Sequence, residues 1–554
     1  MDVYHKILGK YWGYPAFRPL QEEIIHAVCE GKDTLGLMPT GGGKSITFQV
    51  PALIMEGICI VVTPLIALMR DQVDNLRRVG INATAVYSGM SRQEIATELE
   101  RCISGNCKFL YISPERLALE QFREKLQAMN VCLLVVDESH CISQWGYDFR
   151  PSYLHIADVR KLLPGVPILA LTATATPEVV DDIQERLLFK EKNVFRKSFV
   201  RPNLAYIVRR TEDKPGTLVY ILSKVPGTAI VYVRNRKQTK EVAILLQQAG
   251  ISADYFHAGL NREEKEIRQN RWKNNECRVM VATNAFGMGI DKPNVRLVVH
   301  LDMPGSLEEY YQEAGRAGRD NKKAYAVALC SETDSLILKK RIEDEFPDKK
   351  LIKQIYEALD SYNLAHDFSL ADFCLTNQLP PLQVHHALKL LELSGYIEYI
   401  EQQDEAFNKV APQVTRTHPG IKGNSLIIPP SVYEKRRERA GKRITKVVEY
   451  LETERICRSH LLISYFGEKD TEDCGSCDVC LSKNSSGLSN RDFNMIRDKL
   501  LKRLSGEQPL PVNAITESLP FPAEKSITVI RFLVEHDSRF HMKDGEICMK
   551  QNNH

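Results

Sequence analysis

The chain has 554 residues, enough for about three to five domains of typical size. Charged residues (26%) and hydrophobic residues (43%) occur in the proportions of ordinary globular domains. The formal net charge of +3 excludes an overall basic excess that would indicate nucleic acid, so any such surface must come from local patches.

The N-terminal residues and the cysteines bear on the cellular compartment. The stretch MDVYHKILGKYWGYPAF has no long apolar run and no small-residue cleavage site, so we expect no secretory signal. No stretch approaches the length of a membrane span, so we expect no membrane partner. Without a signal, the 14 cysteines are interpreted as reduced thiols of an intracellular protein.

Residues up to about 345 alternate short apolar runs with amphipathic helical stretches. The first set of predicted strands is Thr34–Met38, Cys59–Thr63, Phe109–Ile112, Cys132–Val136 and Ile168–Thr172. The second set is Thr228–Val233, Val279–Thr283 and Arg296–Leu301. Continuous Val/Ile/Leu runs separated by helices are typical of parallel sheets covered on both faces. The sequence therefore predicts two α/β domains, residues 1–203 and 204–345.

The pattern changes after these two domains. Residues 346–430 have two helical stretches, a third predicted helix over Leu382–Ser394, and an alternating strand, YIEYI, which is the order of a winged helix. Residues 431–485 contain the basic stretch EKRRERAGKRITK and then a cysteine cluster. A Ser/Asn-rich linker leads into residues 486–554, where a small helical unit ends in a predicted hairpin: RFHM, a turn at 543–545, then EICM.

The stretch PTGGGKS, residues 39–45, lies between an apolar strand and a helical pattern. In such a loop backbone N–H groups cradle phosphates, the lysine reaches the terminal phosphates, and the hydroxyl binds Mg²⁺. The generic pattern has Gly where this chain has Met38, and the alternative is a flexible glycine turn. The strand–loop–helix setting favours a nucleotide site, which we assign to Thr40, Gly41, Gly42, Gly43, Lys44 and Ser45.

Asp137 and Glu138 end a buried strand about ninety residues later. We expect Asp137, with Ser45, to bind Mg²⁺, and Glu138 to polarise the attacking water in hydrolysis of a phosphoanhydride. The alternative is a pair of solvated acids at a strand end, which the upstream phosphate loop makes the weaker interpretation.

The stretch QEAGRAGRD begins at Gln312 in the second α/β set and places Arg316 and Arg319 three positions apart. One helical turn would point both arginines the same way. Their guanidinium groups would then reach across a cleft to the charge on a transferring phosphoryl group. Alone, this stretch is also compatible with a solvated helix face.

A longer series of segments carries a resemblance. The segments are FRPLQ (17–21), MPTGGGKS (38–45), VTPLIALMRDQ (62–72), YISPERL (111–117), DESHCISQWGYDFRPSY (137–153), ALTATA (170–175), YFHAGL (255–260), ATNAFGMGIDKP (282–293) and QEAGRAGRD (312–320). In this order they resemble the RecQ family of superfamily 2 DNA helicases, over about residues 1–340 and again over 443–482. The resemblance implies two RecA-like domains that use ATP to move 3′ to 5′ on single-stranded DNA and to unwind duplex or branched DNA in recombination, repair or replication.

The resemblance also implies roles for individual residues. Tyr14, Arg18 and Gln21 would bind the adenine, by aromatic stacking and by reading of the base edge. In this family the loop after the acidic pair senses single-stranded DNA and couples it to hydrolysis. The side chains given this coupling role are His140, Gln144, Trp145, Tyr147, Phe149 and Arg150.

The three aromatics of this loop can stack on bases without reading sequence. The alternative is a place in the apolar core, which applies more to Phe149 than to Trp145, whose neighbours are polar or glycine. Arg150 has two possible roles, contact with the DNA backbone or organisation of the loop. One departure from the family is Ser139, where the family usually has Ala.

Cys457, Cys474, Cys477 and Cys480 form a cluster with the spacing of a zinc site. Four thiolates suit a tetrahedral Zn²⁺ and leave no open position, so we expect a structural site. The alternative is two disulfides, which an intracellular chain disfavours. A helix over Arg455–Tyr465 is expected to carry Cys457, and the remaining cysteines are assigned to the apolar core.

The two winged-helix-like units depart from the family's basic arrangement, in which the zinc module follows the motor directly. Here residues 346–430 intervene, and the sequence leaves open whether that unit binds duplex DNA or only packs. The turn at 543–545 has no aromatic residue at its tip, so the strand-separating hairpin is not assigned. Little chain remains for the family's further helical DNA-binding domain, which we expect to be absent.

We therefore predict an α/β protein with two RecA-like parallel-sheet domains, followed by winged-helix-like and helical zinc-binding modules. The expected cofactors are ATP, Mg²⁺ and Zn²⁺. The expected partners are single-stranded and duplex or branched DNA, a single-stranded-DNA-binding protein and other repair proteins, and we expect a monomer in the bacterial cytoplasm, associated with the nucleoid. Two alternatives stay open: an RNA- or DNA-dependent NTPase that remodels without processive unwinding, and an inactive DNA-binding scaffold.

Overall fold

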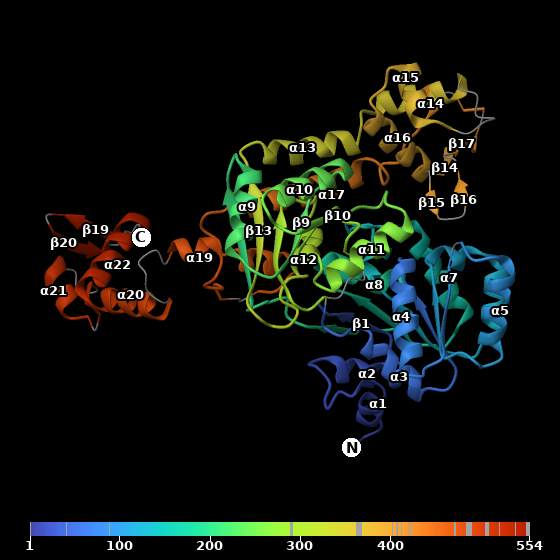
Figure 1. Cartoon of the computed structure of the whole chain (residues 1–554), viewed down its shortest axis with the longest axis horizontal. Coiled ribbons are helices and arrows are strands. Elements are labelled where there is room, and N and C mark those ends of the chain that lie inside the picture. Colours follow the sequence, from blue (N-terminus) through green and yellow to red (C-terminus); the bar gives the residue numbers. More distant parts are fainter. Residues whose placement is uncertain are drawn as a thin grey trace. The chain divides into compact units, whose positions relative to one another are not determined.

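Figure 1 shows the computed structural model of the chain. It describes residues 2–39, 41–87, 89–287, 292–361, 368–400, 403–405, 408–410, 413–418, 420–421, 423–469, 472–483, 490–504, 509–519, 521–537, 539–543 and 545–549. The chain divides into two compact units, the first made of Met1–Glu452 and Leu462–Lys469 and the second of Thr453–Leu461 and Asp470–His554.

The first unit begins with an α/β domain whose described strands form one parallel sheet of seven, in the order β3-β4-β2-β5-β6-β1-β7. The strands are β1 (Thr34–Leu37), β2 (Ile58–Val62), β3 (Ala83–Val86), β4 (Phe109–Ile112), β5 (Val131–Val136), β6 (Ile168–Thr172) and β7 (Val194–Arg196). The α-helices are α1 (Val3–Trp12), α2 (Gln21–Cys29), α3 (Ile46–Ile54), α4 (Ile66–Arg78), α5 (Arg92–Ile103), α6 (Glu120–Gln127), α7 (His155–Leu162) and α8 (Pro177–Arg186). Short 3₁₀ helices are η1 (Pro114–Ala118), η2 (Ser139–Ile142) and η3 (Pro151–Leu154).

Both faces of this sheet are buried. Along β2, Ile60 and Val62 belong to one hydrophobic core, whereas Cys59 and Val61 belong to another. Successive side chains of a strand point to opposite faces, so the two cores lie on the two sides of the sheet. The continuous apolar runs are explained by this double burial.

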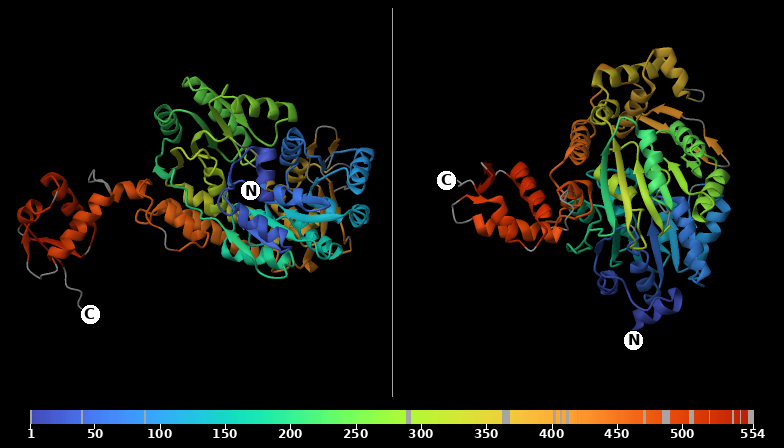
Figure 2. Two further views of the ribbon diagram at one scale, coloured as in Figure 1. Left: turned by 90° about the horizontal axis from the view of Figure 1, so that it is seen from below. Right: turned by 60° about the vertical axis from the view of Figure 1, so that its left-hand side comes forward.

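The second α/β domain has a parallel sheet of six described strands, in the order β10-β11-β9-β12-β13-β8. Its strands are drawn in green to yellow in Figure 2 (right). The strands are β8 (Leu204–Arg210), β9 (Thr228–Tyr232), β10 (Ala253–Phe256), β11 (Val279–Ala282), β12 (Val295–His300) and β13 (Ala324–Cys330). The helices are α9 (Lys214–Lys224), α10 (Arg236–Gln248), α11 (Arg262–Lys273) and α12 (Leu307–Ala314). The two parallel sheets confirm the predicted α/β class.

Residues 334–452 of the first unit are mainly helical. The helices are α13 (Asp334–Glu345), α14 (Lys349–Ser361), α15 (Leu370–Asn377), α16 (Pro381–Leu393) and α17 (Glu434–Glu452), with a 3₁₀ turn η4 (Gly423–Ser425). Two antiparallel strand pairs follow α16: β14 (Ile397–Ile400) with β17 (Gln413–Arg416), and β15 (Gln403–Glu405) with β16 (Asn408–Val410). The predicted order of three helices and a strand is thus present, while the domain boundaries at 345 and 430 stay predictions.

The second unit ends in helices and a small sheet. Helix α18 (Arg458–Tyr465) begins after Cys457, three residues later than the predicted start, and its residues from Leu462 on belong to the first unit. The other helices are α19 (Asp478–Lys483), α20 (Asn490–Leu504), α21 (Val512–Glu517) and α22 (Ala523–His536). Strands β18 (Leu510–Pro511), β19 (Phe540–Lys543) and β20 (Glu546–Met549) form the sheet, and the antiparallel β19–β20 pair is the predicted hairpin. Asp544 of its turn lies outside the described residues.

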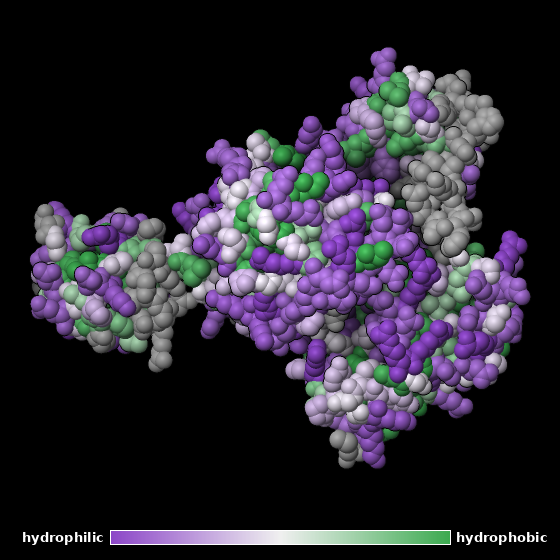
Figure 3. Space-filling view, in the orientation of Figure 1, coloured by the Kyte–Doolittle hydropathy of each residue, from purple (hydrophilic) through white to green (hydrophobic). Residues whose placement is uncertain are grey.

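The molecular surface is mostly hydrophilic on the face drawn in Figure 3, with hydrophobic residues scattered over it. Scattered apolar side chains of this kind are normal on a folded domain. Among the helices of the described residues, none combines the length and the apolar character that crossing a membrane requires.

Candidate functional site

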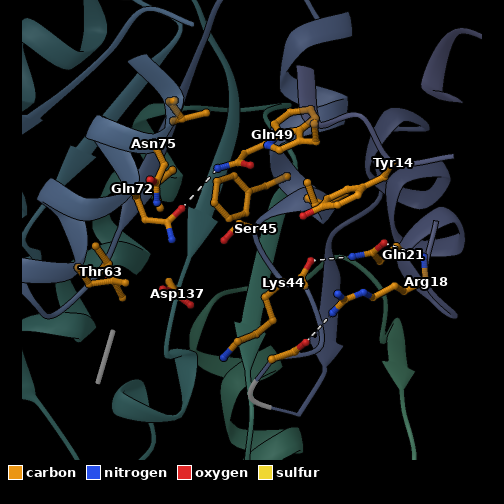
Figure 4. Close-up of a pocket in the computed structure, with 18 of the residues that line it drawn as sticks. Tyr14, Arg18, Gln21, Lys44, Ser45, Gln49, Thr63, Gln72, Asn75 and Asp137 are labelled. Atoms are coloured by element: carbon orange, nitrogen blue, oxygen red, sulfur yellow. Dashed lines mark hydrogen bonds between the residues drawn. The ribbon is translucent and has the colours of Figure 1, made fainter. Parts of the chain in front are cut away.

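A cavity of about 690 Å³ lies at the carboxyl ends of the first sheet's strands. Most of its lining comes from the first α/β domain, including Lys44 and Ser45 of the phosphate loop and Asp137 (Figure 4). Glu138 lines it as well. The second α/β domain contributes Gly287, Gln312, Arg316 and Arg319. Residues predicted from motifs far apart in the sequence therefore face one cavity.

The phosphate loop requires its glycines. Gly41 and Gly43 have φ angles of 80° and 79°, in the left-handed region that glycine adopts without strain. A Cβ on Gly42 would lie 2.8 Å from the Pro39 carbonyl oxygen, and one on Gly43 would collide with the amide of Gln21. The loop backbone is thus close-packed between β1 and α3, as a phosphate cradle needs. Thr40, also predicted to bind nucleotide, lies outside the described residues.

Arg18 and Gln21 bind the backbone of this loop. Arg18 Nη1 donates to the Gly41 carbonyl oxygen at 2.7 Å, and Gln21 Nε2 donates to that of Gly43 at 2.9 Å. Gln21 Oε1 accepts from the Arg18 backbone N–H at 2.8 Å. A primary amide has a second hydrogen and a second lone pair, so Gln21 keeps the capacity to read a base edge. Tyr14 is 52% exposed on the cavity wall, with a ring face that can stack.

The acidic pair follows β5 directly. Glu138 adopts the left-handed conformation (φ 47°), and its carboxylate lies between Lys44 Nζ at 3.5 Å and His140 Nδ1 at 3.4 Å. Burial opposes ionisation of Glu138, but the charges of Lys44 and His140 outweigh it and lower its pKa. Burial and the neighbouring Glu138 charge raise the pKa of Asp137 to about 6. The geometry keeps Glu138 ionised and next to the lysine of the phosphate loop.

The arginines of the second domain project from a turn. Helix α12 ends at Ala314, so Arg316 and Arg319 follow it in a tight turn and do not share a helical turn as predicted. Arg316 is buried and donates to the Gly287 carbonyl oxygen. A Cβ on Gly41 would lie 3.4 Å from Arg319 Cδ, which places Arg319 against the phosphate loop. Both still line the cavity, as the motif predicted.

Gln312 connects the two α/β domains. Its Nε2 donates to Thr174 Oγ1 at 3.0 Å, and Thr174 follows β6 of the first sheet. The cavity thus has a polar contact between the domains at its edge, in addition to the two arginines.

Part of the cavity lining was not predicted from the sequence. Thr63, Gln49, Gln72 and Asn75 also line the cavity, and Gln49 Nε2 donates to Gln72 Oε1 at 3.4 Å (Figure 4). A signal existed for Thr63: it follows β2, which pairs with β5, and neighbouring parallel strands end at the same edge of a sheet. The other three lie on helices α3 and α4, where no strand end marks them.

The loop between η2 and η3 carries the predicted aromatics. Trp145 is 45% exposed, while Tyr147 and Phe149 are partly buried, so none belongs to the fully buried core. His140 is buried, stacks on Tyr147 with ring centroids 4.9 Å apart, and makes a 2.9 Å hydrogen bond from Nδ1 to Thr172 Oγ1. Arg150 pairs with Asp148 at 3.1 Å, so of its two possible roles the geometry supports organisation of the loop.

The cysteine cluster lies within the second unit. The sulfur atoms of Cys457, Cys474, Cys477 and Cys480 all lie within 4.8 Å of one another. The four residues are free, so the disulfide alternative is wrong, and Cys457 and Cys477 have their sulfurs 3.9 Å apart. A tetrahedral Zn²⁺ with Zn–S bonds of about 2.3 Å requires sulfurs roughly 3.8 Å apart, so the donor set fits zinc.

An ion pair between Arg458 and Asp478 lies next to this cluster. Arg458 follows Cys457, and Asp478 follows Cys477; the guanidinium donates to the carboxylate through Nε at 3.0 Å and Nη2 at 2.8 Å. The two segments that carry the thiolates are therefore joined by a two-point ion pair next to the cluster.

Three family models match the chain. They are the DEAD/DEAH box helicase over residues 18–183, the Helicase conserved C-terminal domain over 213–321, and the RecQ zinc-binding model over 420–481.

Relatives cover much of the chain. The "ATP-dependent DNA helicase RecQ" of Bacillus subtilis is 44% identical over 360 residues, which are 64% of this chain and 61% of the relative. The "Probable ATP-dependent DNA helicase RecS" of the same organism is 37% identical over 380 residues, which are 68% of this chain and 76% of the relative. The chain spans 58% of the Haemophilus influenzae "ATP-dependent DNA helicase RecQ". It thus matches about three fifths of the length of these RecQ proteins.

Solved structures share the fold. "Crystal Structure of DUF1998 helicase MrfA bound to DNA" matches with a TM-score of 0.51 at 16% identity, over 62% of this chain and 53% of that one. "DEAD-box helicase Mss116 bound to ssRNA and UDP-BeF" matches with a TM-score of 0.51 at 16% identity, over 70% of this chain and 89% of that one. At this identity the likeness concerns the arrangement of the α/β domains alone.

Proposed function

The chain belongs to the RecQ family of DNA helicases, and from that premise we propose that it hydrolyses ATP to move 3′ to 5′ along single-stranded DNA and unwind duplex or branched DNA. The observation that carries the proposal is the shared cavity. It joins the phosphate loop and acidic pair of one α/β domain to the arginine turn of the other. A motor needs such a site, because closing and opening of a cleft around the nucleotide moves the two domains relative to each other.

Within the cavity each charged group has a proposed role in the hydrolysis of the substrate ATP. Lys44 and the N–H groups of Gly41 and Gly43 bind the phosphates, and Gly42 shapes the loop, its own N–H donating to the Pro39 carbonyl oxygen at 2.8 Å. Glu138 holds the attacking water, and its ionised form is maintained by Lys44. Arg316 and Arg319 stabilise the charge that develops on the transferred phosphoryl group, and Gln312 keeps the second domain in place.

Ser45 and Asp137 would hold Mg²⁺, which neutralises phosphate charge when bound. The donor set fits this ion, since a hydroxyl and a carboxylate are oxygen ligands and both line the cavity. Tyr14, Arg18 and Gln21 are proposed to hold the adenine base.

We propose that the aromatic loop between η2 and η3 binds single-stranded DNA. Trp145, Tyr147 and Phe149 supply ring faces on which bases stack without sequence preference. His140, Gln144 and Arg150 are proposed to fix the loop between the DNA and the acidic pair. In the second unit, the four thiolates fit a structural Zn²⁺, since four protein ligands leave no position for a substrate.

The cellular setting is also part of the proposal. Bacterial relatives support a nucleoid-associated protein of the bacterial cytoplasm that acts in recombination, repair or replication. We propose a monomer that meets a single-stranded-DNA-binding protein and other repair proteins on its substrate.

Strand separation on tailed duplexes tests this function. We expect unwinding of a duplex with a 3′ single-stranded DNA tail, little unwinding with a 5′ tail, and no unwinding by Lys44→Ala, which keeps its affinity for DNA. The reason is that loss of the Lys44 ammonium removes phosphate binding and leaves the aromatic loop intact.

Two other outcomes would contradict this proposal and support a different function. ATP hydrolysis stimulated equally by an RNA oligonucleotide, with no separation of either DNA duplex, would support an NTPase remodeller. Binding of tailed DNA by wild type without ATP hydrolysis would support an inactive scaffold.

A further inference from the structure

Helix α17 contacts the aromatic loop through two arginines. The Arg439 guanidinium lies over the Trp145 ring, 3.9 Å from its centroid, and Arg439 Nη1 donates to the Gln144 carbonyl oxygen at 3.0 Å. Arg443 Nη1 lies 3.5 Å and 3.4 Å from the carbonyl oxygens of Trp145 and Gly146. Residues four apart share one face of a helix, so this face holds both the ring and the backbone of three consecutive loop residues.

A third arginine extends the contact. Arg436 lies over the Phe149 ring, 5.8 Å from its centroid, and precedes Arg439 by three positions on the same face. Three arginines of the basic stretch of α17 are therefore directed at the aromatic loop. Since α17 belongs to neither parallel sheet, these contacts bring a segment from outside the two α/β domains onto the loop.

Arg439 occupies a face of the Trp145 ring on which a nucleic-acid base could also stack. Guanidinium groups are planar and stack on aromatic rings, most favourably on tryptophan. A base stacked on an aromatic ring is held more strongly than a cation over an exposed ring. A base that stacks on this face of Trp145 has to displace Arg439, since both occupy the same face of the ring.

Contacts continue from the loop to the acidic pair. Tyr147 stacks on His140, and His140 Nδ1 lies 3.4 Å from Glu138 Oε2. Glu138 Oε1 in turn lies 3.5 Å from Lys44 Nζ. Through these contacts a change in the loop's position can alter the positions of Glu138 and Lys44.

We propose that Arg439 is a positioning residue for the aromatic loop, holding Trp145 against α17 so that ATP hydrolysis stays slow until single-stranded DNA takes its place on the ring. The inference rests on the proposed function, because it needs a loop that responds to DNA. The restraint on the motor is thereby assigned to Arg439, a side chain 294 positions along the chain from Trp145.

The test compares ATP hydrolysis by wild type, Arg439→Ala and Lys442→Ala, with and without a single-stranded oligo-dT. Arg439→Ala removes one cation–π contact and one hydrogen bond, so we expect kcat without DNA to rise by about three- to tenfold. KM for ATP stays unchanged, because Arg439 does not line the nucleotide cavity. Lys442→Ala is the matched control: it removes a positive charge from the same helix, but its side chain is 73% exposed and pairs with Glu438.

Two further variants separate positioning from general damage. Arg439→Lys keeps a cation over the ring, so its rate without DNA returns toward wild type. If Arg439 acts through Trp145, Arg439→Ala has no further effect on the rate without DNA when Trp145 is already Ala.

The outcomes distinguish this inference from the function on which it rests. A wild type that oligo-dT does not stimulate contradicts the proposed function itself. A stimulated wild type, together with a folded Arg439→Ala whose rate without DNA is unchanged, overturns only the role of Arg439. An equal rise in the Trp145 and Trp145→Ala backgrounds, or a Lys variant as fast as the Ala variant, overturns it as well.

Discussion

At the scale of single residues, helix α12 carries glutamates whose carboxyl groups are largely buried. Glu308 and Glu313 are buried, and Glu313 Oε2 is 2.8 Å from His300 Nε2. Burial, and then the negative charge of Glu313, raise the pKa of Glu309 to about 7, although Arg234 opposes the shift. The neutral form of Glu309 is therefore favoured in the folded chain.

This raised pKa predicts a loss of stability as pH rises. The unfolded chain ionises Glu309 near its ordinary value of 4.5, whereas the folded chain holds the proton until about 7. The free energy of unfolding therefore falls as the pH rises from 4.5 to 7, and the loss is complete above pH 7. The total loss is at most about 3 kcal/mol. Glu309→Gln should therefore unfold at a higher temperature than wild type at pH 8, and not at pH 5.

Thermal unfolding at the two pH values measures this difference. Glu263→Gln serves as the control, because Glu263 is an exposed glutamate on α11. A Glu309→Gln variant whose shift in Tm is the same at pH 5 and pH 8 would contradict the assignment.

At this scale, the residues whose place the sequence predicted follow strand ends, and their catalytic roles stay predictions. Lys44 and the acidic pair follow β1 and β5, and all three residues line the cavity. Sequence reasoning did not find Arg439, because a basic stretch looks the same whether its side chains face solvent or a distant tryptophan. Only the fold brings Arg439 and Trp145 together.

At the scale of elements, the predicted strands were the continuous Val/Ile/Leu runs. Each predicted strand begins and ends within one residue of an observed strand. These strands could be predicted because a strand buried on both faces of a sheet has a continuous apolar run. The strands that were missed differ in composition. β13 (AYAVALC) alternates with alanine, β10 (ADYF) contains an aspartate, and β3 (ATAV) and β7 (VFR) are short. β8 (LAYIVRR) has residues that favour a strand, although it ends in two arginines.

The cysteine cluster allows a prediction for one element of the second unit. Cys477→Ser removes one of four thiolates and should lower bound zinc well below one ion per chain, with a lower unfolding temperature for the second unit. Cys548→Ser is the control, a cysteine of the same unit that lies outside the cluster. Elemental analysis after purification without chelator gives the metal content. Equal zinc in both variants would contradict the site.

At the scale of the whole molecule, the segment between the two α/β domains is held by residues far along the chain. Phe199 stacks on Phe466 with centroids 4.7 Å apart, and its backbone N–H donates to Glu468 Oε1 at 2.6 Å. The sequence predicted a division near residue 203, and the two sheets lie on either side of it. It did not predict that residues 466–468 pack on this segment, since a contact across 269 positions leaves no local pattern.

The central claim is that the acidic pair and the aromatic loop form one DNA-dependent ATPase site. The most direct measurement is ATP hydrolysis with and without a single-stranded DNA oligonucleotide, on wild type and on Trp145→Ala. We predict strong stimulation of wild type and the same rate with and without DNA for Trp145→Ala, because we propose the partly exposed Trp145 ring as the surface on which a base stacks. Equal rates with and without DNA in wild type, or full stimulation of Trp145→Ala, would contradict the account.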